Sequence, residues 1–366
     1  MFFSFLNLFN TAIGQNHANA FSINAVVIDS LTFEAIQFVS IYKTRDKKGT
    51  LSDFKGGFTI DNVLSNDSIV FSYVGYEKSL IVANENTIYD TIYLNREVQL
   101  VDEVIVLADN SILYELISNV RKTQSNTVEV AKSYFELESY HNEQQLELFQ
   151  GYYNGKYQGY NVCDLQMKNG RFALAPLSKR IFASTESSKA MYLHNIVESN
   201  EYFPVSPFEL VRGKLKKYYS LSLNAKYVDN NGNTIYIISF EPRKDRNSNF
   251  AGKVWIDSLS NNIIKTKLLV SNASVHPFRP IWSSHDLDTV NIEITKSFDV
   301  ENDSIRLNTL HFNYDLVYRS SEDSSLNIST QAVLHAYNYN DAFILPFFNF
   351  PDVSNADYRR IQMLPC

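Results

Sequence analysis

Residues 21–106 alternate apolar and polar side chains in short runs, which is the pattern of half-buried β-strands. Turn-forming residues interrupt these runs about every 8 to 12 positions, a spacing typical of an antiparallel β-sandwich. We predict seven strands here, at residues 23–28, 36–43, 57–60, 68–73, 78–83, 89–95 and 103–106. Glycine, asparagine and aspartate tolerate the backbone of turns, so turns are expected at 49–50, 55–57 and 65–67.

The pattern then changes from a period of two to the period of a helix. Asn110 or Ser111 can cap this helix, and Arg121 and Lys122 lie near its C-terminal dipole. Its apolar positions fall on one face: Ile112, Leu113, Leu116, Ile117 and Val120. We predict a linker helix within residues 108–128, whose apolar stripe is a packing face.

Alternation returns after this helix and continues through most of the remaining chain. Strands are expected at 133–140, 146–153, 164–167, 220–227, 234–240, 253–257, 263–268, 291–298, 304–318 and 325–337, with a hairpin turn at 228–233. Helical signals interrupt them at 184–197 and 207–218, the second after the N-cap residue Ser206 and Pro207. The chain is therefore predicted to be mostly β: a seven-stranded antiparallel β-sandwich at 21–107, a linker helix, and a larger antiparallel β-sheet or half-barrel with a few helices at 129–366.

Composition and charge narrow the function classes. The chain has 366 residues, with 33 basic and 40 acidic side chains and a net charge of −7, so it has no broad cationic face for nucleic acid. Aromatic residues make up 14%, which suits pleated, half-buried surfaces. The two cysteines, Cys163 and Cys366, cannot build a disulfide framework, and whether they pair stays open.

The start of the chain resembles a secretory signal. Residues 2–13 are almost continuously apolar, a run too short for the roughly 20 residues that cross a bilayer as a helix. The sequence Ala18-Asn19-Ala20 follows, which a signal peptidase can cleave. We expect residues 1–20 to be a signal peptide and the protein to be exported, to the periplasm or in association with the outer membrane. The alternative is a buried N-terminal segment, because no basic residue precedes the apolar run; whether Met1 is the true start stays open.

An ordered set of short motifs in residues 21–107 resembles a known family. The motifs stand at residues 23–29 (INAVVID), 36–41, 49–58, 72–76 (SYVGY) and 100–106 (LVDEVIV). Together they resemble the carboxypeptidase-regulatory-like domain, a transthyretin-like sandwich that occurs beside zinc carboxypeptidases and at the front of many TonB-dependent receptors. The sequence departs from the family at Ala25, where glycine is usual, which affects only local backbone detail.

Two further resemblances concern the rest of the chain. The order of sandwich, helix and large sheet, with the closing segment 352–361, is similar to an uncharacterised group of envelope proteins, a likeness that implies no activity. The strand–turn–strand segment 253–268 resembles a hairpin of periplasmic lipoprotein-carrier half-barrels, in which an apolar concave sheet holds acyl chains.

Catalytic and metal-binding signatures do not emerge from the sequence. A zinc carboxypeptidase needs a glutamate three residues after a histidine, and none of the seven histidines has one. The nearest approach to a metal site is the segment 285–288 (HDLD) together with His276, which we interpret as a solvated acidic loop. The segment 228–240 lacks the final glutamate of a calcium loop, and no HExxH, GxSxG or P-loop motif occurs. We predict no catalytic residue, no metal site and no cofactor.

Two side-chain groups nevertheless have chemical potential. Glu136 and Glu138 share one strand face and can in principle act as acid and base in glycoside hydrolysis, although a solvated face is favoured. Aromatic clusters can stack on sugars or face a partner, although packing is favoured; they comprise Tyr152, Tyr153, Tyr157 and Tyr160, and Phe343, Phe347, Phe348 and Phe350.

The sequence therefore leads to one main hypothesis and two alternatives. The main hypothesis is a non-catalytic exported envelope protein, in which the sandwich is an interaction or stabilising module and the large β domain binds another envelope protein, a lipid or a glycan. The first alternative is a hydrolase with an unrecognised site in the large domain. The second is a periplasmic lipid or lipoprotein carrier, which fails if the concave face of the large domain is filled by the chain's own side chains.

Overall fold

The computed structural model describes residues 20–96 and 110–341, apart from 32, 47, 74–75, 88, 124–126, 176–183, 230–231, 281, 302–303 and 321–324. The predicted signal peptide, the strand at 103–106, the phenylalanine cluster at 343–350, Cys366 and the segment 352–361 lie outside the described residues. The chain divides into two compact units, Met1–Val98 and Gln99–Cys366, which we call unit 1 and unit 2.

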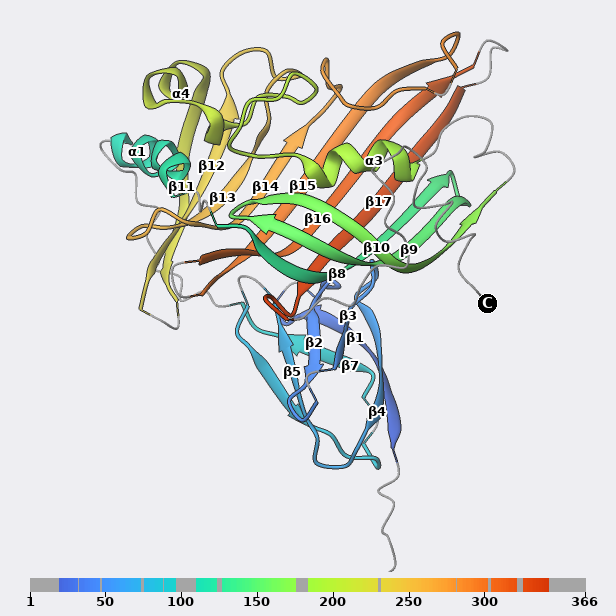
Figure 1. The fold of residues 1–366 in the computed structure, drawn as a ribbon. Helices are drawn as coiled ribbons and strands as arrows, with labels where there is room; N and C mark the ends of the chain where they lie inside the picture. Colours follow the sequence, from blue (N-terminus) through green and yellow to red (C-terminus); the bar gives the residue numbers. More distant parts are fainter. Residues whose placement is uncertain are drawn as a thin grey trace, which may run out of the picture. The chain divides into compact units, whose positions relative to one another are not determined.

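Unit 1 contains two sheets, with strand orders β4-β1-β7 and β3-β2-β5-β6 (Figure 1). The strands are β1 (Phe21–Asp29), β2 (Ser40–Lys43), β3 (Gly49–Leu51), β4 (Gly57–Val63), β5 (Ser68–Ser72), β6 (Ser79–Val82) and β7 (Thr91–Leu94). Apolar side chains from both sheets form one core, in which the rings of Phe58 and Phe71 meet edge to face at 5.6 Å. The predicted sandwich is confirmed.

Three details of unit 1 differ from the prediction. The pairing is not antiparallel throughout, because β1 and β7 run parallel. The predicted turn at 49–50 is strand β3, which pairs with β2, so the reversal lies at 44–48. The predicted strand 36–43 is shortened to β2, since Phe38 has a positive φ of 59°. Alternation records which face of a strand is buried but not which neighbour it pairs with or in which direction.

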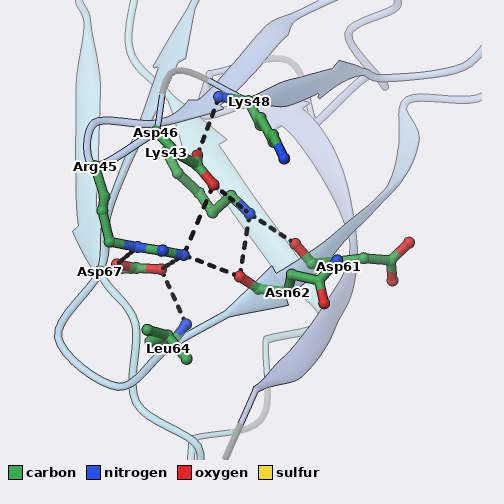
Figure 2. Close-up of polar contacts among 8 residues, drawn as sticks. All are labelled: Lys43, Arg45, Asp46, Lys48, Asp61, Asn62, Leu64 and Asp67. Atoms are coloured by element: carbon green, nitrogen blue, oxygen red, sulfur yellow. Dashed lines mark hydrogen bonds and ion pairs between the residues drawn. The ribbon is translucent and has the colours of Figure 1, made fainter. Parts of the chain in front are cut away.

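A polar network holds the β2–β3 end of unit 1 against β4 (Figure 2). The buried Lys43 ammonium donates to the carbonyl oxygens of Asp61 at 2.9 Å and Asn62 at 3.1 Å, where the chain bends through the positive φ of Asn62. Arg45 donates to the Asp67 carboxylate at 2.8 Å. Burial would raise the pKa of Asp67, but the hydrogen bond from Arg45 brings that pKa below its usual value. Because these charges satisfy one another, we interpret the network as structural.

Unit 2 is built on one open, ten-stranded antiparallel sheet with the order β10-β9-β8-β17-β16-β15-β14-β13-β12-β11 (Figure 1). Its strands are β8 (Glu129–His141), β9 (Gln144–Gln158), β10 (Asn161–Leu174), β11 (Tyr219–Val228), β12 (Thr234–Pro242), β13 (Ala251–Asp257), β14 (Ile263–Val270), β15 (Asp286–Glu301), β16 (Ser304–Arg319) and β17 (Ser325–Tyr337). Every strand predicted in this part of the chain is present, and the first strand of the unit pairs with the last. The predicted large antiparallel sheet is confirmed.

The helices of unit 2 pack on one face of this sheet, which we call the inner face. They are α1 (Ser111–Asn119), the short 3₁₀ segment η1 (Val120–Lys122), α3 (Ser184–Leu193), the 3₁₀ segment η2 (Pro207–Glu209) and α4 (Arg212–Tyr218). Their buried side chains share one core with the inner face. Ser206 and Glu209 form the predicted cap as a capping box. The predicted N-cap residue Asn110 makes no side-chain cap hydrogen bond to α1, and its amide N–H donates to the carbonyl of Leu221.

The cover of the inner face consists of α3 and the segment that follows it to residue 211. Its buried residues lie in the same core as the sheet: Met191, Tyr192, Ile196, Val197, Phe203 and Phe208. Tyr192 meets Phe135 of β8 edge to face at 5.6 Å. The opposite face of the sheet, which we call the outer face, carries the polar positions of each strand, such as Glu136 and Glu138.

Candidate functional site

One charged residue stands in the middle of the inner face. Along β15 the side chains of Ile292 and Ile294 point into the core, and the same phase places Lys296 there. Lys296 has no exposed surface, and its neighbours across the sheet are Thr266 on β14 and Leu310 on β16, both fully buried. A lysine in a fully buried position is rare unless a counter-charge pairs with it.

The Lys296 ammonium is held by backbone carbonyls alone. Its Nζ donates to the carbonyl of His194, in the cover, at 2.6 Å and to the carbonyl of Tyr160, between β9 and β10, at 3.4 Å. No ion pair to Lys296 occurs in the described part of the chain. Burial lowers the pKa of Lys296 from 10.5 to about 7. Near pH 7 Lys296 is therefore a desolvated amine that is partly protonated, and no anion lies beside it in the described part of the chain.

His194 adds a second polar group that lacks a partner. Its ring is 3% exposed, stacks on Phe203 at 4.2 Å and lies 6.0 Å from Phe250. Its Nδ1 is buried and has no hydrogen-bond partner among the described residues. Burial and then the charge of Lys296 lower the pKa of His194 to about 3, so the imidazole is neutral near pH 7.

Tyr160 fixes the position of the other carbonyl that binds Lys296. The buried Tyr160 hydroxyl accepts from the backbone N–H of Ile263 at 3.0 Å and lies 3.2 Å from the Thr123 hydroxyl. Its ring meets Phe298 edge to face at 5.0 Å. Lys296 thus joins the cover to the connection between β9 and β10.

The inner face that carries Lys296 is apolar and rich in aromatic rings. The inner-face side chains with no exposed surface include Phe149, Leu310, Phe312, Tyr314 and Leu334. They pack against the cover, and the Ser188 hydroxyl lies 3.1 Å from that of Tyr314. The described inner face is therefore filled by the chain's own side chains, and a ligand reaches Lys296 only if part of the cover moves.

The cover is hydrogen-bonded to the sheet at both ends. At its C-terminal end, Val205 donates to the carbonyl of Ser248 at 2.9 Å and accepts from Phe250 N–H at 3.0 Å, while Tyr219 donates to Val205 at 2.7 Å. At the α3 end, polar contacts with the sheet include those of Ser188 with Tyr314 and of the His194 carbonyl with Lys296.

The residues singled out in the sequence lie apart from this site. Glu136 and Glu138 share the outer face, as predicted. Of the four tyrosines, Tyr153, Tyr157 and Tyr160 are buried in the core, which confirms packing for these three, and Tyr152 is 47% exposed on the outer face.

The residues that come nearest to a metal site in the sequence, His276 and the segment 285–288, each contact other side chains in the structure. The His285 ring is hydrogen-bonded to the Tyr318 hydroxyl at 2.5 Å, Asp288 pairs with Arg319 at 2.5 Å, and the His276 ring stacks on Phe278. Across the described residues, no group of three or more histidine, cysteine or acidic side chains is arranged to hold a metal ion. Cys163 is an exposed free thiol.

Neither Lys296 nor His194 was predicted from the sequence as a site residue. A signal for Lys296 was present, because positions 292, 294, 296 and 298 share one phase of the predicted strand and the other three are apolar. No signal pointed to His194, since its carbonyl meets an ammonium 102 residues away.

Comparisons with known proteins bear on each unit. Residues 23–106 match the family model of the CarboxypepD_reg-like domain, which confirms the resemblance of that region. A search of curated proteins found no match. No helix in the described ranges combines the length and the apolar character needed to cross a membrane.

Solved structures resemble the chain distantly. An outer membrane lipoprotein-sorting protein domain from Vibrio parahaemolyticus is 12% identical, with 62% of this chain and 91% of that one covered and a TM-score of 0.25. A LolA superfamily protein from Nitrosomonas europaea is 8% identical, with coverages of 67% and 97% and a TM-score of 0.23. MucB is 10% identical, with coverages of 63% and 94% and a TM-score of 0.21. Scores this low carry no functional inference.

Proposed function

We propose that this chain is a non-catalytic, exported binding protein of the cell envelope, and that unit 2 holds the acyl chain of an anionic lipid on its inner face. Of the sequence hypotheses, this is the carrier alternative combined with the lipid-binding form of the main one. The observation that carries the proposal is Lys296, a buried amino group at the centre of an apolar face, with no anion beside it in the described part of the chain.

The buried Lys296 ammonium lowers the stability of the fold. Moving an ammonium out of water costs several kcal/mol, and two neutral carbonyls repay only part of that cost. For stability alone, a methionine of similar length serves better at this position. The same ammonium is valuable to a ligand, because a hydrogen bond between two charged groups is about twice as strong as one to a neutral carbonyl.

In this proposal the ligand enters the inner face by displacing α3. When α3 lifts, the apolar side chains beneath it become accessible to an acyl chain, and the carbonyl of His194 leaves Lys296. A carboxylate or phosphate headgroup then takes the place of that carbonyl. Burial of the acyl chain contributes about 0.8 kcal/mol per CH₂, which offsets the cost of opening the cover.

The sandwich of unit 1 has a separate role in this proposal. Its buried charges, such as Lys43 and Asp67, are bonded within the unit, which favours a structural role for them. We infer that the sandwich is an interaction or stabilising module. The hydrolase alternative gains no support, since Lys296 and His194 have no carboxylate bonded to them in the described part of the chain.

The test is a titration of the full chain with two amphiphiles of equal chain length, palmitate and hexadecanol. We expect palmitate to bind, and Lys296→Met to weaken palmitate at least about tenfold, which corresponds to the loss of about 1.4 kcal/mol of binding. Hexadecanol binding should change little. Lys253→Met, which removes an exposed lysine from β13, is the matched control and should behave as the unaltered protein. The proposal is wrong if neither amphiphile binds, or if Lys296→Met binds palmitate as well as Lys253→Met does.

A further inference from the structure

The outer face of unit 2 carries a second arrangement of side chains, independent of the inner face. It spans β17, β8, β9 and β10, and we call it the β8–β10 platform. Its members stand in register across neighbouring strands and comprise Tyr134, Glu136, Glu138, Tyr140, Gln150, Tyr152, Arg171 and Gln331.

The first row of the platform is aromatic. Tyr134 on β8 stands opposite Tyr152 on β9, and their ring centroids are 5.1 Å apart with a tilt of 50°. Tyr152 is 47% exposed, although its strand neighbour Tyr153 is buried. This row offers an accessible ring face on an otherwise polar surface.

The second row consists of planar hydrogen-bonding groups. Glu136, Gln150 and Arg171 stand opposite one another on β8, β9 and β10. The Tyr134 hydroxyl donates to Glu136, and Arg171 Nε donates to Gln150 Oε1 at 2.5 Å. These bonds leave the Arg171 Nη groups without a protein partner in the described part of the chain, so they are available as donors.

A third group extends the platform toward β17. Glu138 Oε2 accepts from the Tyr140 hydroxyl at 2.9 Å and from Gln331 Nε2 at 3.1 Å. The other carboxylate oxygen, Oε1, has no partner among the described residues and is available as an acceptor. Glu138 is thus held through Oε2 by two neighbours while its Oε1 stays open, and Arg171 is held through Nε while its Nη groups stay open.

This combination matches the chemistry of a sugar. The C–H face of a pyranose packs on an aromatic ring, and its neighbouring hydroxyls need donors and acceptors side by side. Rows on one strand face are about 7 Å apart, so a sugar on the ring pair places the next group of a chain over the polar row. The two carboxylates and one guanidinium give no strong charge of one sign, which disfavours a polyanion such as nucleic acid.

We propose that the β8–β10 platform binds a neutral glycan chain. Glu136 and Glu138 then bind hydroxyls and do not cleave the chain. Canonical glycoside hydrolysis needs two carboxyl groups on opposite sides of the scissile bond. These two project from the same face of one strand, so both approach a ligand from the same side.

The test is binding of the full chain to three neutral hexasaccharides, cellohexaose, chitohexaose and maltohexaose, measured by calorimetric titration. We expect at least one of them to bind, and Tyr152→Ala or Glu138→Gln to weaken that binding at least about tenfold. Tyr218→Ala is the matched control, because Tyr218 is 40% exposed but lies on α4. Tryptophan fluorescence verifies that each variant is folded.

Two outcomes would overturn this proposal: none of the three saccharides binds, or Tyr152→Ala and Tyr218→Ala weaken binding equally. The result is independent of the lipid proposal, since Lys296→Met alters the opposite face and should leave saccharide binding unchanged.

Discussion

Replacing Lys296 by methionine should stabilise unit 2. Methionine keeps the length of the side chain, fits an apolar core and carries no charge. The two carbonyls that now bind Nζ, those of His194 and Tyr160, lose a donor. The outcome therefore depends on whether desolvation of the ammonium outweighs these two hydrogen bonds.

The magnitude follows from the pKa of Lys296. A pKa lowered from 10.5 to about 7 by burial corresponds to about 5 kcal/mol, at 1.36 kcal/mol per pKa unit. Losing the hydrogen bond from the ammonium to the His194 carbonyl costs about 1.5 to 3 kcal/mol, and the 3.4 Å contact with the Tyr160 carbonyl adds little. We expect Lys296→Met to gain about 2 kcal/mol of unfolding free energy at pH 7.

The sign of the pH dependence is also fixed. Between pH 7 and 10.5 the unfolded chain keeps the proton of Lys296 and the folded chain releases it, so the stability of the unaltered protein rises with pH in that window. Below pH 7 the full cost of the buried charge is present. Between pH 7 and 9.5 the difference should therefore shift by about 3 kcal/mol against Lys296→Met, so that a gain of about 2 kcal/mol at pH 7 becomes a deficit of about 1 kcal/mol at pH 9.5.

Urea unfolding followed by tryptophan fluorescence measures both effects. The chain has two tryptophans, Trp255 and Trp282, and both belong to unit 2, so the signal reports on that unit alone. Lys253→Met is the control and should differ from the unaltered protein by less than about 0.5 kcal/mol. The reasoning is refuted if Lys296→Met is less stable at pH 7, or if its difference from the unaltered protein is constant between pH 7 and 9.5.

Three further predictions test other parts of the structure. His194 is neutral in the fold with a pKa of about 3, so the free energy of unfolding falls as the pH drops from 6.5 towards 3. His194→Phe should remove about 3 kcal/mol of that loss between pH 6.5 and 4, as measured by urea unfolding at both pH values. Gly252→Ala places a Cβ 1.9 Å from a carbonyl oxygen of β14 at a φ of +155° and should lower the free energy of unfolding by at least about 3 kcal/mol. Gly213→Ala is the control, because Gly213 has open space around it in α4, and this change should be neutral or slightly stabilising. Equal shifts of the thermal midpoint would contradict this. Tyr76→Phe removes a 2.6 Å hydrogen bond to the buried Asp29 carboxylate and should lower the calorimetric stability of unit 1 by about 1 to 2 kcal/mol, and no change would show that the bond contributes nothing.

The strands of unit 2 were predictable because their alternation is long and regular. The strand predicted at 325–337 has those bounds in the structure, and the one predicted at 304–318 ends one residue later, at Arg319. Each has one apolar face against the core and one polar face, which is the condition under which a period of two is visible. The helix predicted at 207–218 is divided in the structure: the local cap begins only the 3₁₀ segment 207–209, and α4 starts at Arg212 because Leu210 and Val211 have extended backbone.

Pairing and the candidate site were harder to predict. The parallel pairing of β1 with β7 and the short strand β3 depend on neighbours that no local pattern identifies. Lys296 is one charged residue among the apolar positions of a strand face, and this pattern alone does not predict a binding site. Its significance appears only when the fold brings the carbonyls of His194 and Tyr160 to it and brings no carboxylate.

The most direct test of the central claim is a crystal structure of the full chain with palmitate. The account predicts an acyl chain along the inner face between the sheet and a displaced α3, with the carboxylate within hydrogen-bond distance of Lys296 Nζ in place of the carbonyl of His194. Palmitate bound elsewhere, or bound while Lys296 still donates to His194, would contradict it.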